Sequence, residues 1–333
     1  FLSFKCIHAI LIRYHIEQSF SIAIQAIGIC SLCIAYLIPV QGQNLVPNPS
    51  FEVFTMCPPS NLGNGGLMEC EPWNSVSGTT DYFHACSDPM YRGVPYNFQG
   101  YQPAHMGAAY SGQYTWAFSA GAEFMMAPLL DTLEADHCYK VSAWINLANE
   151  GCGADQYGIL LTPDPPTVFV GNFPQINWGG DIITDTVEWT NVLGYYTAIG
   201  NEQYITLGNF RGSSQTGVDP ACYGPPAFSY YYVDDVLVEE IAVQQIDVDL
   251  GGPVTVCDSF IIDPGGDPDV VYNWSTGHQG HTLTVYTTGV YSVTASFACT
   301  QAVGDIEVTI LNSIQVDLGP DLVLCLGDNV EIS

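Results

Sequence analysis

The chain has 333 residues, with 34 acidic side chains against 5 Lys and Arg, and its formal net charge is −29. This charge excludes general binding to nucleic-acid phosphates, because almost no cationic side chains are present to displace counterions. The hydrophobic share of 47% and the aromatic share of 12% suffice for a buried core, which excludes a disordered chain. The 33 Gly and 21 Pro argue against a helical bundle and favour an all-β chain rich in turns.

Residues 1–42 are predicted to be a signal peptide. The run Ser19–Val40 carries no charge, Lys5 and Arg13 precede it, and small and polar residues around Gly42 follow it. This order is typical of a secretory leader cleaved near Gly42. The run is also long enough for a membrane anchor, but the small residues after it favour cleavage. We therefore expect an exported protein without a membrane span in the mature chain.

Residues 44–241 are expected to form a large β unit. Between Tyr139 and Leu147, large or apolar side chains occupy the odd positions, and mostly polar ones the even positions. A strand with this period of two buries one face and exposes the other, as in antiparallel sandwiches. No long stretch of this unit has a convincing helical period.

A repeated segment follows the large unit. The residues Ile246–Gly251 recur as Ile314–Gly319, and Cys257 recurs as Cys325 at the same offset. A fixed offset that includes a cysteine marks tandem β modules. The repeat therefore predicts two copies: a complete module over 246–311 and the start of a truncated one over 314–333.

The cysteines after the leader are expected to form disulfides within each unit. Six of them precede residue 242 and two lie in the first module. Even counts per unit in an exported chain indicate disulfides, although the pairing of the six stays open. In the module, Cys257 and Cys299 are predicted to pair, and closing that loop would contribute roughly 4 kcal/mol. Trp274 lies between them in the sequence, as in sandwiches where an indole packs on the bridge.

Several stretches resemble a known family. The residues Asn44–Glu52 (NLVPNPSFE) and Tyr231–Val238 (YYVDDVLV) are similar to the first and last strands of galactose-binding-like jelly rolls, the fold of many carbohydrate-binding modules. With further stretches, they resemble the N-terminal domain of gliding-motility-associated surface proteins exported by the type IX pathway, and the module resembles their Ig-like or PKD-like repeats. The further stretches are Asp81–Cys86, Leu129–Val141, Gly200–Phe210, Tyr272–Gly277 and Gly289–Val293.

The resemblance implies a structural Ca²⁺ site. In such folds the first and last strands often lie side by side, which would bring Glu52 close to Asp234 and Asp235. Carboxylate oxygens suit Ca²⁺, and buried acids without a cation would repel each other. Because a strand has a period of two, only one of the paired aspartates is expected to point inward, and we choose Asp234. The alternative is that one Asp caps a turn and the other acids are exposed.

A second candidate site is the segment 91–116, which is dense in aromatic residues. Sugar rings stack on aromatic faces, and amide side chains can bind hydroxyl groups, so a glycan site is one interpretation. The other is that these rings fill the small core of a long loop and satisfy their hydroxyl groups locally. The ligand-binding candidates are Tyr96, Asn97, Gln99, Tyr101 and Trp116.

The expected fold class is therefore all-β, a jelly-roll sandwich followed by a small Ig-like sandwich and a truncated second copy. The expected function is non-catalytic binding of an extracellular glycan or surface polymer, with the repeats as a stalk and attachment to the cell surface through a region beyond Ser333. Two alternatives remain open. The jelly roll would be a purely structural spacer of an adhesin, or the accessory module of a secreted hydrolase.

Overall fold

The computed structural model describes residues 42–60, 63, 65–117, 121–220, 227–311 and 325–327. The predicted signal peptide lies outside this range except for Gly42, and the predicted second copy lies outside it except for 325–327. Within the described ranges, no helix is both long and apolar enough to cross a bilayer. The only helices there are two short 3-10 turns, η1 (Leu67–Glu69) and η2 (Ser213–Gln215). The prediction of an all-β fold is confirmed.

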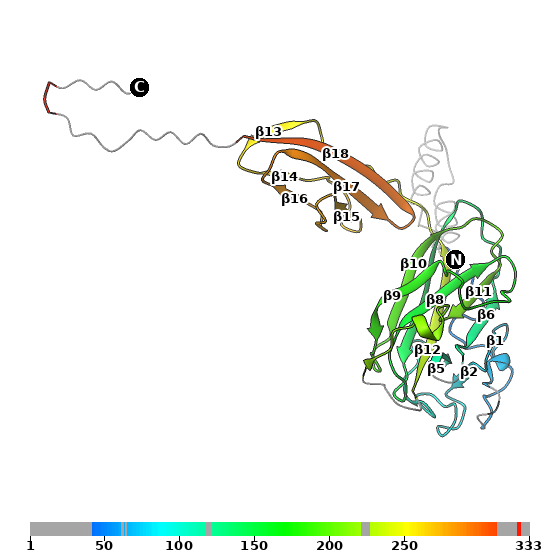
Figure 1. Cartoon of the computed structure of the whole chain (residues 1–333). Helices are drawn as coiled ribbons and strands as arrows, with labels where there is room; N and C mark the ends of the chain where they lie inside the picture. The colour runs from blue at the N-terminus through cyan, green and yellow to red at the C-terminus, as the bar shows by residue number, and fades with distance from the viewer. Residues whose placement is uncertain are drawn as a thin grey trace, which may run out of the picture. The chain divides into compact units, whose positions relative to one another are not determined.

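Two five-stranded antiparallel sheets build the jelly-roll sandwich (Figure 1). In order of pairing, the first sheet contains β1 (Asn74–Ser77), β6 (Phe124–Pro128), β11 (Tyr204–Gly208), β8 (Ala154–Thr162) and β9 (Ile176–Ile183). The second contains β10 (Thr190–Thr197), β7 (Cys138–Leu147), β12 (Phe228–Glu240), β5 (Ala109–Ala117) and β2 (Asp81–His84). A short hairpin of β3 (Tyr96–Asn97) and β4 (Gly100–Tyr101) stands apart from both sheets.

The main core lies between the two sheets, and period-two alternation places its residues there. On β7, every odd position from Tyr139 to Leu147 is buried, as the sequence predicts. On β12, Tyr231 and Val233 enter the same core. Each strand thus contributes every second side chain to the sandwich interior, which leaves the alternate side chains on the outer face.

The first residues of the jelly roll lie beside its last strand. Asn44 forms an antiparallel bridge with Glu239, and the Leu45 N–H donates to the Val238 carbonyl at 2.7 Å. The Asn44 side chain adds a bond from Nδ2 to the Val236 carbonyl at 2.9 Å. The expectation that the two ends of this unit meet therefore holds.

A smaller β unit follows at residues 254–311 (Figure 1). Its four-stranded sheet contains β13 (Val254–Cys257), β18 (Thr300–Leu311), β17 (Gly289–Phe297) and β15 (Val271–Trp274) in that order. A two-stranded sheet contains β14 (Phe260–Ile262) and β16 (Leu283–Val285). Both sheets share one core, which includes Trp274 and the alternating residues Tyr291, Val293 and Ala295.

The predicted Cys257–Cys299 bridge is wrong. Cys257 is exposed and unpaired, and Cys299 forms a disulfide with Cys138 at the start of β7. Strand β18 explains the difference, because Cys257 aligns with Leu311 at its far end while Cys299 directly precedes its first residue. A strand of this length separates its ends by roughly 35 Å, far beyond the reach of a disulfide.

The cysteines of the jelly roll also depart from pairing within one unit. Cys57 pairs with Cys86, but Cys138 pairs with Cys299 of the smaller unit. Cys70 is buried and carries no disulfide. Burial raises the pKa of its thiol to about 12, so Cys70 behaves as a small core residue rather than as a nucleophile.

This pairing predicts how two cysteine variants differ. Replacing both partners (Cys138→Ser with Cys299→Ser) should lower the free energy of unfolding by roughly 2–5 kcal/mol, because the bridge closes a very long loop. The control, Cys257→Ser, should change it by less than about 0.5 kcal/mol. Urea melts measure both values. Recovery of a Cys257–Cys299 peptide from a non-reduced digest would contradict the assignment.

Candidate functional site

The outer face of the second sheet carries an aromatic cluster. The side chains that alternate with the core residues of β12, Tyr230 and Tyr232, lie there with Phe83 of β2 and Tyr110 of β5. The Phe83 ring meets the Tyr232 ring edge-on at a centroid distance of 5.4 Å, and Tyr110 lies 4.8 Å from Tyr232. All four side chains are fully buried. Because a sheet face of this kind would expose a large apolar area, another part of the chain has to cover it.

The segment before β5, which contains the β3–β4 hairpin, provides this cover. Phe98 stacks on Phe83 at 5.8 Å. The Asn97 amide donates to the Tyr110 hydroxyl at 2.9 Å, and its oxygen accepts the Tyr232 hydroxyl at 2.8 Å. The Gln99 amide reaches the hydroxyl of another tyrosine of the face (Tyr114, 3.2 Å). The amides of Asn97 and Gln99 therefore satisfy the hydroxyl groups of two buried tyrosines and one partly buried tyrosine.

These bonds show how Asn97 and Gln99 are engaged within the protein. The two side chains are 9% and 3% exposed, so neither offers its amide to a ligand at the surface. Both side chains lie in the small core that the covering segment forms with the sheet. The other three candidate ligand-binding residues lie elsewhere on the hairpin or on the sheet.

A buried ion pair fastens the covering segment to the sheet. Arg92 is fully buried, and its Nη2 lies 2.9 Å from Oδ1 of Asp81 on β2. The second oxygen of Asp81 accepts the Tyr230 hydroxyl at 2.6 Å. Burial raises the pKa of Asp81 to about 6, although Tyr230 and Arg92 oppose the shift. Removing one partner would leave the other charge unpaired in the interior, which is costly.

Tyr96 and Tyr101 are the exposed part of the hairpin. They are direct cross-strand partners, with 61% and 45% of their surfaces exposed. Their ring centroids lie 4.7 Å apart at an interplanar angle of 63°. Asn149 holds the hairpin from outside, because its Oδ1 accepts the Tyr101 N–H at 2.6 Å. Side chains of the hairpin alternate between its two faces, so the face opposite Asn97 presents the rings of Tyr96 and Tyr101 to solvent.

Trp116 belongs to a different place. It lies near the end of β5, and its indole N–H donates to the carbonyl of Ser213, the first residue of η2, at 3.3 Å. The described contacts connect it with neither Tyr96 nor Tyr101. Asn149 is the residue that sequence reasoning missed, since a lone Asn in a turn carries no signal of which backbone group it will bind.

The three predicted metal ligands converge on one loop, residues 105–109. Asp234 Oδ2 accepts the first two N–H groups of this loop, those of His105 and Met106, at 2.9 and 3.1 Å. Glu52 Oε1 accepts the N–H groups at its other end (108 and 109) at 2.8 and 3.0 Å. The fold thus brings Glu52 and the last strand to the same loop, as the resemblance implies.

Asp235 lies at a bulge of β12 and turns away from Asp234. Its oxygens bind the Ser50 hydroxyl and Nδ1 of His105. The His105 ring stacks on Trp144 of β7 at 4.2 Å. Asp234 is fully buried, whereas the Asp235 side chain is 21% exposed. Choosing Asp234 as the inward residue agrees with this placement.

The electrostatics of the pair follow from burial. Desolvation and the neighbouring Asp235 charge raise the pKa of Asp234 to about 8, against the backbone N–H groups that lower it. Five of the six carboxylate oxygens of Glu52, Asp234 and Asp235 accept N–H or O–H donors in this arrangement. A carboxylate oxygen that accepts one hydrogen bond keeps a second lone pair, so these bonds do not exclude a Ca²⁺ ion. Glu52, Asp234, Asp235 and the loop 105–109 form a hydrogen-bonded clasp, and Ca²⁺ stays a prediction of the sequence alone.

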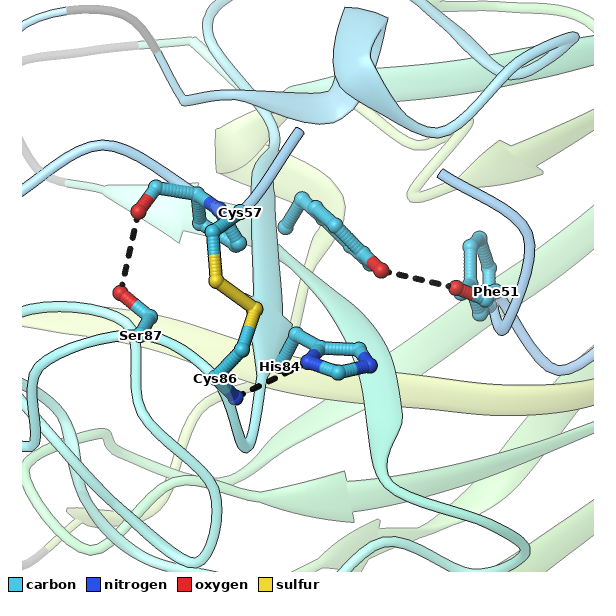
Figure 2. The surroundings of a disulfide bond; sticks show 7 residues. Phe51, Cys57, His84, Cys86 and Ser87 are labelled. Atoms are coloured by element: carbon cyan, nitrogen blue, oxygen red, sulfur yellow. Dashed lines mark hydrogen bonds between the residues drawn. A yellow bond between two sulfur atoms is a disulfide. The ribbon is translucent and has the colours of Figure 1, made fainter. Parts of the chain in front are cut away.

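A disulfide close to this region also brings potential metal ligands together. Within the described residues, Cys57, His84 and Cys86 form the one group of three whose ligand atoms lie within 4.8 Å of one another (Figure 2). Both sulfur atoms belong to the Cys57–Cys86 bond, and His84 Nδ1 accepts the Cys86 N–H at 2.9 Å. Burial lowers the pKa of His84. A neutral imidazole that accepts this bond serves to hold the cross-linked turn.

Comparisons with known proteins give low similarities. No family model matches the chain, and no curated protein matches its sequence. The xylan-binding CBM22-1 domain of Paenibacillus barcinonensis Xyn10C is 14% identical with a TM-score of 0.34, over 61% of this chain and 98% of that domain. The tandem CBM22-1–CBM22-2 domain of the same protein is 12% identical with a TM-score of 0.34, over 81% of this chain and 86% of that one.

An adhesin domain is similar to the same degree. The K1 cleaved adhesin domain of Lys-gingipain from Porphyromonas gingivalis is 10% identical with a TM-score of 0.32, over 58% of this chain and 96% of that domain. Because these TM-scores are low, what those proteins bind does not by itself tell what this chain binds.

The raised pKa of Asp234 predicts a pH dependence. Between about pH 4 and pH 8 the native state keeps a proton that the unfolded chain releases, so this group's contribution to stability falls as pH rises. Asp234→Asn removes the titration. The stability of the variant relative to the wild type should therefore increase with pH, by up to about 1.4 kcal/mol per pH unit in this window. Urea melts at several pH values measure it. The exposed Asp164→Asn is the control, and parallel curves for wild type and Asp234→Asn would contradict the prediction.

The clasp also predicts the response to metal. If hydrogen bonds alone hold the clasp, neither Ca²⁺ nor a chelator should move the melting temperature. Glu52→Ala should lower the free energy of unfolding by about 1 kcal/mol, since two N–H groups of the loop lose their acceptor. A melting temperature that rises with Ca²⁺ in the wild type, but not in Glu52→Ala, would instead support the calcium site.

Proposed function

We propose that this chain is a non-catalytic protein of the cell exterior whose jelly roll binds a neutral glycan through Tyr96 and Tyr101. The observation that carries the proposal is the exposure of these two adjacent rings on a hairpin whose Asn97 and Gln99 side chains are buried. Aromatic faces at such positions suit the apolar C–H faces of sugar rings, and the tyrosine hydroxyl groups suit sugar hydroxyls.

The backbone beneath the rings supports binding without rearrangement. A side chain at Gly100 would meet Asn149 Oδ1 at 2.2 Å, so glycine lets the hairpin approach Asn149 closely. The bonds of Asn97 and Gln99 to tyrosines of the second sheet hold the same hairpin against that sheet. A platform that is already ordered loses little conformational entropy when a ligand binds.

The net charge bears on the class of ligand, and the disulfides bear on the compartment in which the protein works. A chain with a net charge of −29 repels acidic polymers, which favours an uncharged polysaccharide over one with carboxylate or sulfate groups. The Cys57–Cys86 and Cys138–Cys299 disulfides are typical of proteins from oxidising compartments. The charge therefore supports a neutral glycan as the ligand, and the disulfides support a location outside the cytoplasm.

The test is affinity electrophoresis in gels that contain neutral polysaccharides. The wild type should be retarded in at least one gel, and the variant with Tyr96→Ala and Tyr101→Ala should migrate as in the empty gel, a loss of more than about tenfold in affinity. Its melting curve should match that of the wild type, because both rings are exposed. Tyr286→Ala, an exposed tyrosine of the smaller unit, is the matched control.

Equal retardation of the wild type and the double variant would overturn the role of these tyrosines. No retardation of the wild type in any gel would favour the alternative of a structural spacer.

A further inference from the structure

The Cys138–Cys299 disulfide closes a covalent ring of unusual size. It joins residues 161 positions apart, with Cys138 as the first residue of β7 and Cys299 immediately before β18. The strands β7 to β12 of the jelly roll and β13 to β17 of the smaller unit therefore all lie inside this ring. A force that pulls on the two ends of the chain cannot extend the residues inside this ring while the disulfide is intact.

The non-covalent neighbours of Cys138 place the start of the jelly roll at the same end of the sheet. β7 and β12 are antiparallel, so Tyr139 faces Glu240, and the Ile241 N–H donates to the Cys138 carbonyl at 2.9 Å. Asn44 bridges Glu239 on the other side of β12. Three parts of the chain thus lie side by side at one end of the second sheet. They are Asn44, the last residues of β12 and Cys138.

We propose that this disulfide is a tension-bearing cross-link that diverts a pulling force around the segment 139–298. Force applied at Asn44 crosses the last residues of β12 to Cys138, passes through the sulfur–sulfur bond to Cys299 and leaves along β18. Once the bonds of Asn44 and Leu45 to β12 have broken, the load reaches Cys138 along the chain, and the segment inside the ring carries none of it. This proposal is independent of the glycan proposed above, because it concerns only how the chain transmits load.

Strand β18 is suited to be the outgoing element. It pairs with β17 along nine residues, from Gly289 to Phe297, and its far end pairs with β13 in parallel. The bonds of a ladder run perpendicular to the strands, so a pull along β18 loads many of them at once. At the other end, Asn44 and Leu45 are held to β12 by only a few bonds, which a pull breaks one after another. The segment 44–138 is therefore expected to extend first.

Single-molecule force extension of the full chain, held by handles at its two ends, tests this. In oxidised protein the segment 44–138 should extend by roughly 220 Å, because the Cys57–Cys86 bond hides 29 of its residues. The 161-residue ring, which would add up to about 550 Å, should stay hidden. A dithiol reductant should release it.

The variant with Cys138→Ser and Cys299→Ser supplies the control. Under oxidising conditions it should extend several hundred ångström further than the wild type, and the difference should vanish in dithiol. Cys257→Ser should behave as the wild type does. Full extension of the oxidised wild type, or equal lengths for it and the double variant, would overturn the proposal. Should the double variant not fold, the oxidised and reduced wild type still give the comparison.

Discussion

Strand β12 imposes the constraint on which the rest of the jelly roll depends, because it is aromatic on both faces. Tyr231 and Val233 enter the sandwich core, while Tyr230 and Tyr232 face outward and have to be covered. The segment with the β3–β4 hairpin provides that cover, and the pair of Asp81 and Arg92 fastens it. The exposed tyrosines are a consequence of this cover, since a hairpin that buries one face presents the other to solvent.

The acids near the ends of the jelly roll show how one residue pattern can serve two kinds of chemistry. Carboxylates that meet in a fold bind a cation, a set of N–H donors or both, and each lowers the cost of burying them. Here the loop 105–109 supplies the donors to Glu52 and Asp234. Backbone N–H groups carry no signature in the sequence, so the sequence predicts the cation but not these donors.

One disulfide links the two β units covalently and so affects how the chain transmits a pulling force. Pairing within each unit is the natural expectation from even counts, but Cys138 and Cys299 join one unit to the other. In a protein that binds an immobile polymer, this bond would keep most of both units out of the line of force. The proposed glycan site and the proposed tension-bearing cross-link would then serve the same purpose, attachment under load.

The sequence by itself determined the all-β class, the alternation of Tyr139–Leu147 and the aromatic density of 91–116. These are local patterns, and a period of two is visible without coordinates. The meeting of the two ends of the jelly roll is a long-range contact, and only the resemblance to a known fold implied it. Only the tertiary structure decided that Asn97 and Gln99 point inward while Tyr96 and Tyr101 point outward, because that depends on which face the hairpin covers. The tertiary structure also decided the partner of Cys299, since the length of β18 separates Cys299 from Cys257. The spacing of cysteines along the chain says nothing about their distance in space.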